Sequence, residues 1–72
     1  MNLLEDALAG WNGSANENLW SSPAWYAHQA GYWFRESGLG PLKSCRMSRG
    51  TKVRINERIL KIADDGSATL IE

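Results

Sequence analysis

The stretch from residue 51 to residue 71, TKVRINERILKIADDGSATLI, decides the fold because apolar and polar residues alternate along much of it. A period of two is the pattern of strands whose side chains point alternately to the two faces of a sheet. The sequence DDG at residues 64–66 predicts a tight hairpin turn with its glycine in the left-handed conformation. With a second turn at residues 56–57, the stretch predicts a three-stranded antiparallel meander, with strands at about residues 51–55, 58–63 and 67–71.

The two turns also set the register of the predicted sheet, with Val53 opposite Leu60 and Lys52 opposite Lys61. One face is then apolar and is the expected contact for a helix; it carries Val53, Ile55, Leu60, Ile62, Ala68 and Leu70. The other face mixes cations with apolar residues and carries Lys52, Arg54, Ile59, Lys61, Thr69 and Ile71.

Before the meander, the apolar spacing is that of helices. Ser22 followed by Pro23 is a helix start signal, and Gly38 is a stop signal, which predicts a helix at residues 23–37. A shorter helix is expected at residues 2–9, with Asn2 as its cap and Gly10 as its stop. The predicted fold is therefore α+β: a short N-terminal helix, a loop, and one longer aromatic-rich helix packed on the three-stranded meander, all in a single small domain of residues 1–72.

The longer helix begins PAWYAHQAGYWF and contains more aromatic residues than one helix face can bury. A projection at 100° per residue predicts a core face with Tyr26, Ala27, Ala30, Trp33 and Phe34. An adjoining face carries Trp25, His28, Tyr32 and Arg35. This second face is either covered by the first helix and the loop, where we expect Leu19 and Trp20 to pack on the core, or left open for a partner.

The composition of the 72-residue chain excludes several means of stabilisation and several kinds of site. A single cysteine and a single histidine form neither an internal disulfide nor a structural zinc site, and we expect no metal and no cofactor. The first residues contain Glu5 and Asp6 where an export signal would be basic, and no apolar run is long enough to span a membrane. The sequence thus predicts a soluble cytoplasmic protein.

Catalytic chemistry is not expected. His28 has no nucleophile or orienting carboxylate on the neighbouring turns of its predicted helix. Cys45 lies between Lys43 and Arg46, which favours a thiolate, but no base or second cysteine is assigned to it. The Asp64-Asp65 pair is explained by turn geometry. The chain is therefore predicted to be a non-enzyme with no catalytic residues.

Charge is strongly segregated although the formal net charge is zero. Residues 43–61 have a net charge of +6, and the segments before and after them have −3 each. We expect a small protein-binding module. By analogy with short proteins of phages and other mobile elements, it would be an inhibitor or adaptor. It would bind and occlude a larger host protein that has an acidic or amphipathic surface. The expected partner-binding residues are Lys52, Arg54, Ile59, Lys61, Ile71, Arg46, Arg49, Trp25, Tyr32 and Arg35.

Two other interactions are left open by the same features. The basic segment 43–61 could contact phosphates, which would make the chain a small nucleic-acid-binding regulator. The acidic segments before and after the basic segment argue against nucleic-acid binding, because they cancel its positive charge. Exposed aromatics or an edge formed by Ile59 and Ile71 could also support a homo-oligomer.

Overall fold

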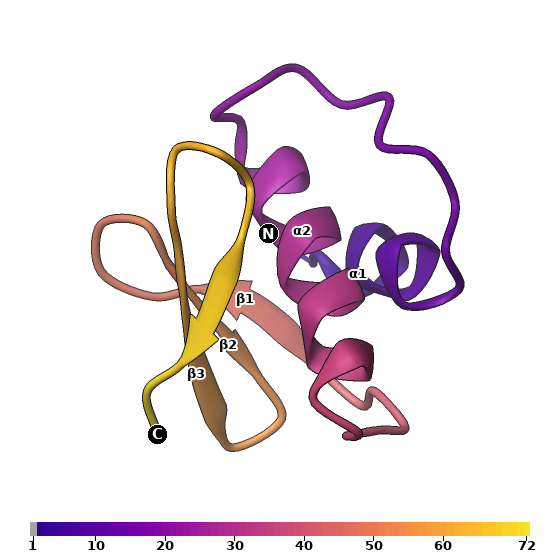
Figure 1. Ribbon diagram of the computed structural model, residues 1–72, viewed down its shortest axis with the longest axis vertical. Helices are drawn as coiled ribbons and strands as arrows, with labels where there is room; N and C mark the ends of the chain where they lie inside the picture. The colour runs from indigo at the N-terminus through magenta and orange to yellow at the C-terminus, as the bar shows by residue number, and fades with distance from the viewer. Residues whose placement is uncertain (1) are drawn as a thin grey trace.

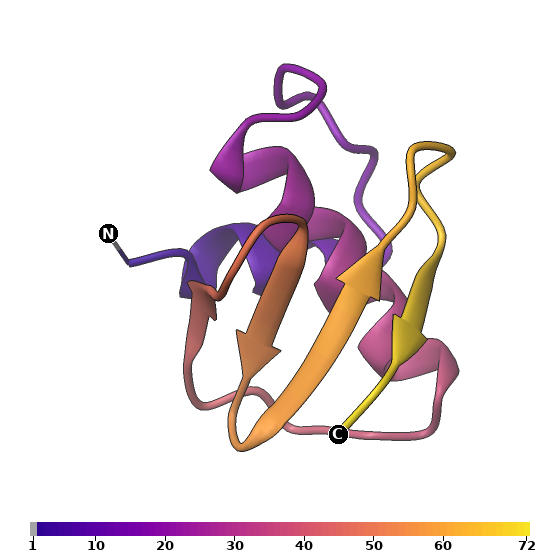
Figure 2. The same ribbon diagram turned by 90° about the vertical axis from the view of Figure 1, so that its left-hand side faces the viewer.

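Two helices precede a four-stranded antiparallel sheet in the computed structural model, which describes residues 2–72. The helices are α1 (Leu4–Trp11) and α2 (Pro23–Glu36). The strands are β1 (Cys45–Met47), β2 (Lys52–Ile55), β3 (Arg58–Ile62) and β4 (Ala68–Leu70), and they lie in the order β1-β2-β3-β4. Helix α2 packs on one face of the sheet, and α1 lies on the far side of α2 (Figures 1 and 2).

The α+β class is confirmed, but the prediction of three strands is wrong. The additional strand, β1, pairs with β2 and places Cys45 opposite Ile55. It has only three residues, which is too short for alternation to be recognised. Asn56 holds the chain ahead of β1, because its side-chain oxygen accepts from the Lys43 and Ser44 amides at 2.7 and 3.2 Å.

The predicted register is confirmed at both hairpins. Val53 pairs with Leu60 and Lys52 with Lys61 across β2 and β3, and Leu60 pairs with Leu70 across β3 and β4. In the first turn, the positive φ that a two-residue loop needs falls on Asn56, at 56°, which an asparagine tolerates. The second turn closes with a hydrogen bond from the Gly66 amide to the Ala63 carbonyl at 3.0 Å.

The ends of α2 follow local chemistry. The Ser22 hydroxyl accepts from the Trp25 amide at 3.1 Å, and Pro23 occupies the first turn. At the other end Gly38 has a φ of 76°, and the Leu39 amide donates to the Phe34 carbonyl at 3.1 Å, which is the Schellman pattern. The helix stops at Glu36, one residue earlier than expected.

Helix α1 lies two residues later in the chain than the predicted 2–9. The Asn2 side chain accepts from the Leu4 amide at 3.0 Å, but the cap position itself is taken by Leu3, which is buried. Gly10 does not end the helix. It lies inside α1, buried against α2, because the absence of a side chain there allows the two helices to approach closely.

The core fills the space between α2 and the sheet. Ala27, Ala30 and Phe34 are buried as expected, whereas Tyr26 and Trp33 are only partly buried. The buried core residues of the strands and of the chain before them are Leu42, Cys45, Val53, Ile55, Leu60 and Ile62. The two alanines of α2 therefore lie on the side of the helix that faces larger side chains of the sheet.

Gly31 provides a direct test of the close packing of α1 on α2. A Cβ atom at this position would lie 1.9 Å from the Ala7 carbonyl oxygen, which is backbone and cannot rotate away. We expect Gly31→Ala to lower the free energy of unfolding by about 2 kcal/mol, because the overlap outweighs the gain of about 1 kcal/mol in helix propensity. Urea denaturation measures this, with the exposed Glu36→Ala as control; a Gly31→Ala protein as stable as the wild type would contradict the packing.

Candidate protein-binding surface

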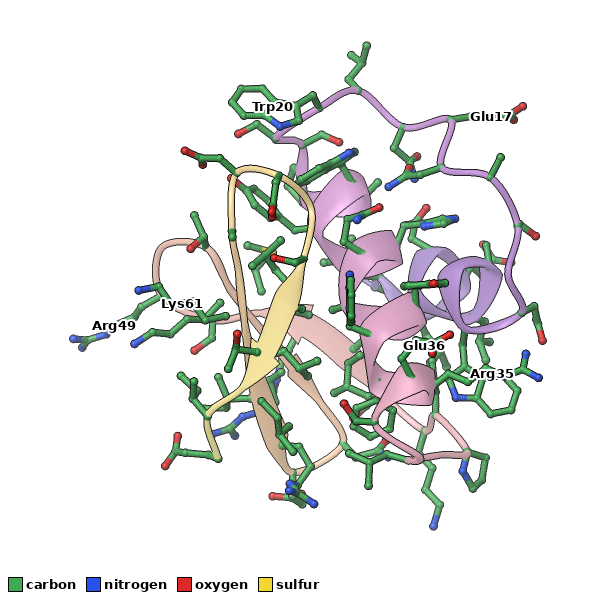
Figure 3. The ribbon with its side chains drawn as sticks, viewed as in Figure 1. Glu17, Trp20, Arg35, Glu36, Arg49 and Lys61 are labelled. Carbon is green, nitrogen blue, oxygen red and sulfur yellow. The ribbon has the colours of Figure 1, made fainter. Side chains whose placement is uncertain are left out.

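The face of the sheet that points away from α2 collects most of the residues expected to bind a partner. We call it the outer face and define it by the strand residues whose side chains alternate with the core, together with Ile71 directly after β4. These residues are Arg46, Lys52, Arg54, Ile59, Lys61, Thr69 and Ile71. Arg49 lies beside them in the connection from β1 to β2, and its side chain and that of Lys61 extend away from α2 (Figure 3).

Like charges face one another across the strands of the outer face. Arg46 is the direct partner of Arg54, and Lys52 is the direct partner of Lys61. None of the residues that define the face is acidic. Directly opposed like charges are destabilising in a sheet. The outer face therefore carries an electrostatic cost that a negatively charged surface would relieve.

The apolar part of the outer face is smaller than expected, because Ile59 is only 8% exposed. Ile59 does not belong to the core cluster. Its cross-strand neighbour Arg54 is partly buried. This burial fits an arginine whose aliphatic stem covers an apolar side chain. The Ile59 carbonyl also accepts from the Ile71 amide at 2.9 Å, which keeps the chain end close. Ile71, at 43% exposed, is thus the apolar side chain of this face that a partner can reach.

The three expected partner-binding residues on α2 do not join the outer face. Trp25 is partly buried, packs against the core and lies near Gly66 in the β3–β4 turn. Tyr32 is 41% exposed on another side of the molecule. Arg35 stacks over the Trp11 ring at 4.8 Å and donates to the Trp11 carbonyl at 2.9 Å, so it joins the two helices (Figure 3).

The loop before α2 differs from the expectation that it packs on the core. Leu19 and Trp20 are 83% and 64% exposed. The Leu19 carbonyl accepts from the Ser22 amide and hydroxyl, so the turn closes before the loop can reach the core. Ser21 takes a positive φ of 69° within this turn. The Trp20 and Trp25 rings form a T-shaped pair with centroids 6.2 Å apart.

Two of the groups considered for catalysis, Cys45 and the Asp64-Asp65 pair, have surroundings that account for their presence. Cys45 is buried, and desolvation raises the pKa of its thiol to about 12, which removes the thiolate that its basic neighbours had suggested. The Asp65 carboxylate accepts from the Ser67 amide and hydroxyl, which lowers its pKa and fixes the turn. Within residues 2–72, no cluster of three or more His, Cys, Asp or Glu residues is placed to hold a metal ion.

Comparison of the chain with protein-family models, with curated proteins and with solved structures finds no match. In the part of the chain that the structure describes, neither helix combines the length and the apolar character needed to cross a membrane.

The repulsion on the outer face predicts that Lys61→Glu stabilises the protein. The exposed Lys61 lies opposite Lys52, so the substitution turns a repulsive pair into an attractive one. We expect a gain of about 0.5 kcal/mol in the free energy of unfolding at low salt, shrinking at high salt. Denaturation at two salt concentrations checks this, with Lys43→Glu, outside the strands, as the charge-matched control. Equal effects of the two substitutions would contradict a local repulsion.

Proposed function

We propose that the chain is a non-catalytic protein-binding module whose outer face binds an acidic or amphipathic surface of a larger protein. The observation that carries this proposal is the acid-free outer face, where cations oppose one another across β1 and β2 and across β2 and β3. An acidic partner relieves that repulsion on binding, so electrostatic complementarity favours the complex.

The chemical character of the face supports a protein partner. Its cations gather over β1, β2 and β3, while Ile71 adds exposed apolar area at the β4 side. Interfaces between proteins commonly combine apolar contacts with arginine side chains. Such a module acts by covering the surface that it binds, which is the mode of action of an inhibitor or adaptor.

The test is affinity capture with charge-reversed variants. We expect the immobilised chain to retain a protein from a lysate of its host cells, and Arg54→Glu to weaken that interaction at least about tenfold. Lys43→Glu changes the net charge equally, but Lys43 precedes β1 and lies outside the strands, so this variant should bind like the wild type. Retention of the same protein by Arg54→Glu, or of none by the wild type, would refute the proposal.

Nucleic-acid binding is the second candidate, and the specific observation in its favour is the same acid-free set of cations. Phosphate contacts would make the affinity fall steeply with salt, by roughly 0.9 in log–log slope for each phosphate neutralised on duplex DNA. A mobility-shift assay with duplex and single-stranded probes distinguishes the two functions. Our proposal predicts no shift at moderate salt, and a salt-dependent shift that Arg54→Glu removes would favour the alternative.

A further inference from the structure

The two edge strands of the sheet, β1 and β4, differ in how the rest of the chain treats them. Along β1, Cys45 and Met47 alternate with the residues that bond to β2, so their backbone groups point outward. The Leu3 amide donates to the Cys45 carbonyl at 3.4 Å, and Arg46 places a charge in the middle of the strand. A covering segment and a charged residue are two of the common ways in which proteins protect an edge strand.

The hydrogen bonds from β4 to β3 show which of its groups face outward. The Ser67 carbonyl accepts from β3 side of the turn at 2.8 Å, and the Ile71 amide donates to β3 at 2.9 Å. Bonded residues alternate along an antiparallel strand, so the amides and carbonyls of Ala68 and Leu70 point away from β3. Strand β4 is the last in the sheet and has a strand on one side only (Figure 2). These four backbone groups are therefore directed to the position of a fifth strand.

The sequence of this edge carries none of the usual protection. Residues 67–71, SATLI, contain no charge, no proline and no glycine. Thr69 and Ile71 are branched at the β carbon and exposed, which favours an extended strand. The composition of the β4 edge thus fits pairing with another strand, whereas that of β1 does not.

The β4 edge is complementary to itself. When two copies run antiparallel about Thr69, Ala68 of each copy lies opposite Leu70 of the other, and their outward groups form four backbone hydrogen bonds. The pairing ends there. The Gly66 carbonyl already accepts from two side chains of α2, and the Glu72 carbonyl accepts from a side chain of β3.

The side chains and the helices both fit this arrangement. On the outer face, Thr69 of one copy lies opposite Thr69 of the other, which is a favourable cross-strand pair. On the other face, the half-buried Leu70 of each copy lies beside the small Ala68 of its partner. Helix α2 contacts all four strands, so the helices of the two copies lie about four strand spacings apart, roughly 19 Å. Packed helices need only about 8–10 Å, so they do not collide.

We propose that β4 is a dimerisation edge, on which a second copy of this chain adds antiparallel and joins the two sheets into one. The contact has a two-fold axis at Thr69, as expected for a pair of identical chains. It uses the backbone of β4 and does not depend on the proposed protein-binding function, which a monomer can also fulfil.

The first experiment is sedimentation equilibrium of the intact chain from about 10 μM to about 1 mM. We expect the mean mass to rise from 8.0 kDa toward twice that value, with a dissociation constant on the order of 100 μM, because the contact is small. The nearest charges across the contact are alike, with Glu72 of one copy near Asp65 of the other. Salt should therefore tighten the dimer, whereas it should weaken a complex at the basic outer face.

An NMR dilution series locates the contact on the chain. The amide protons of Ala68 and Leu70 should shift with concentration and exchange more slowly in the dimer, because they become hydrogen-bonded. The exposed Trp20 indole should not shift with concentration, since it lies outside the contact.

Charge substitutions at Thr69 test the register. Thr69→Glu places a carboxylate beside Lys61 of its own chain, so the fold is kept, but opposite a second carboxylate in the dimer. We expect Thr69→Glu and Thr69→Lys each to weaken the dimer about fivefold, and their equimolar mixture to associate about fivefold more tightly than either alone. Urea midpoints check that both variants fold. The same pair of substitutions at Thr51, next to β2, is the control and should show no gain on mixing.

The outcomes decide the proposal. A salt-tightened dimer with shifted Ala68 and Leu70 amides, and stronger association of the mixed Thr69 variants than of each alone, supports it. A monomer at 1 mM overturns it and leaves the edge to an extended segment of another protein. Association that leaves both amides unshifted, or that shows no gain on mixing the variants, also overturns it and indicates contact through another surface.

Discussion

Packing of α2 on one face of the sheet is the interaction on which the rest of the structure depends. The buried residues of α2, chiefly Ala27, Ala30 and Phe34, meet the inward side chains of the strands. Helix α1 is stacked on α2, and the amide of its cap residue Leu3 donates to the Cys45 carbonyl of β1. Its apolar residues therefore complete the helical layer, and neither helix covers the other side of the sheet (Figure 1). The outer face follows from this arrangement.

The small size of the chain makes that arrangement depend on close contact. A domain of this length buries only roughly 60% of the surface of its unfolded chain, so each buried group has a large share in stability. Gly10 and Gly31 let the backbones of the two helices touch, and Arg35 ties them together through Trp11. The opposed cations and the unpartnered His28 act against stability in the same small molecule.

Much of the fold could be predicted from the sequence because the signals were local. Turn chemistry at Asn56 and Gly66 set the register, and the Ser22-Pro23 cap set the start of α2. Strand β1 could not be predicted, because three residues carry too little periodicity and its position depends on the distant Asn56 side chain. Gly10 was expected to end the first helix, but it lies inside α1. Close packing against α2 requires a glycine there, and a tertiary contact of this kind leaves no local pattern.

The surfaces were harder to predict than the elements. Alternation placed Lys52, Arg54 and Lys61 on the outer face, but it carries no information on how far neighbouring side chains cover Ile59. The hydrogen bond from the Gln29 side chain on α2 to the Gly66 carbonyl in the β3–β4 turn joins residues more than 30 positions apart, and no local pattern marks it.

The sheet register is the central claim, and interstrand contacts between Hα protons in NMR spectra test it most directly. The Ile62 amide donates to the Thr51 carbonyl, so the next pair, Lys52 and Lys61, is a non-hydrogen-bonded pair with closely spaced Cα atoms. Strong Hα–Hα cross-peaks are expected for this pair and for Arg54 with Ile59. Cross-peaks displaced by one residue, such as Lys52 with Leu60, would contradict the register and turn the cations toward the core.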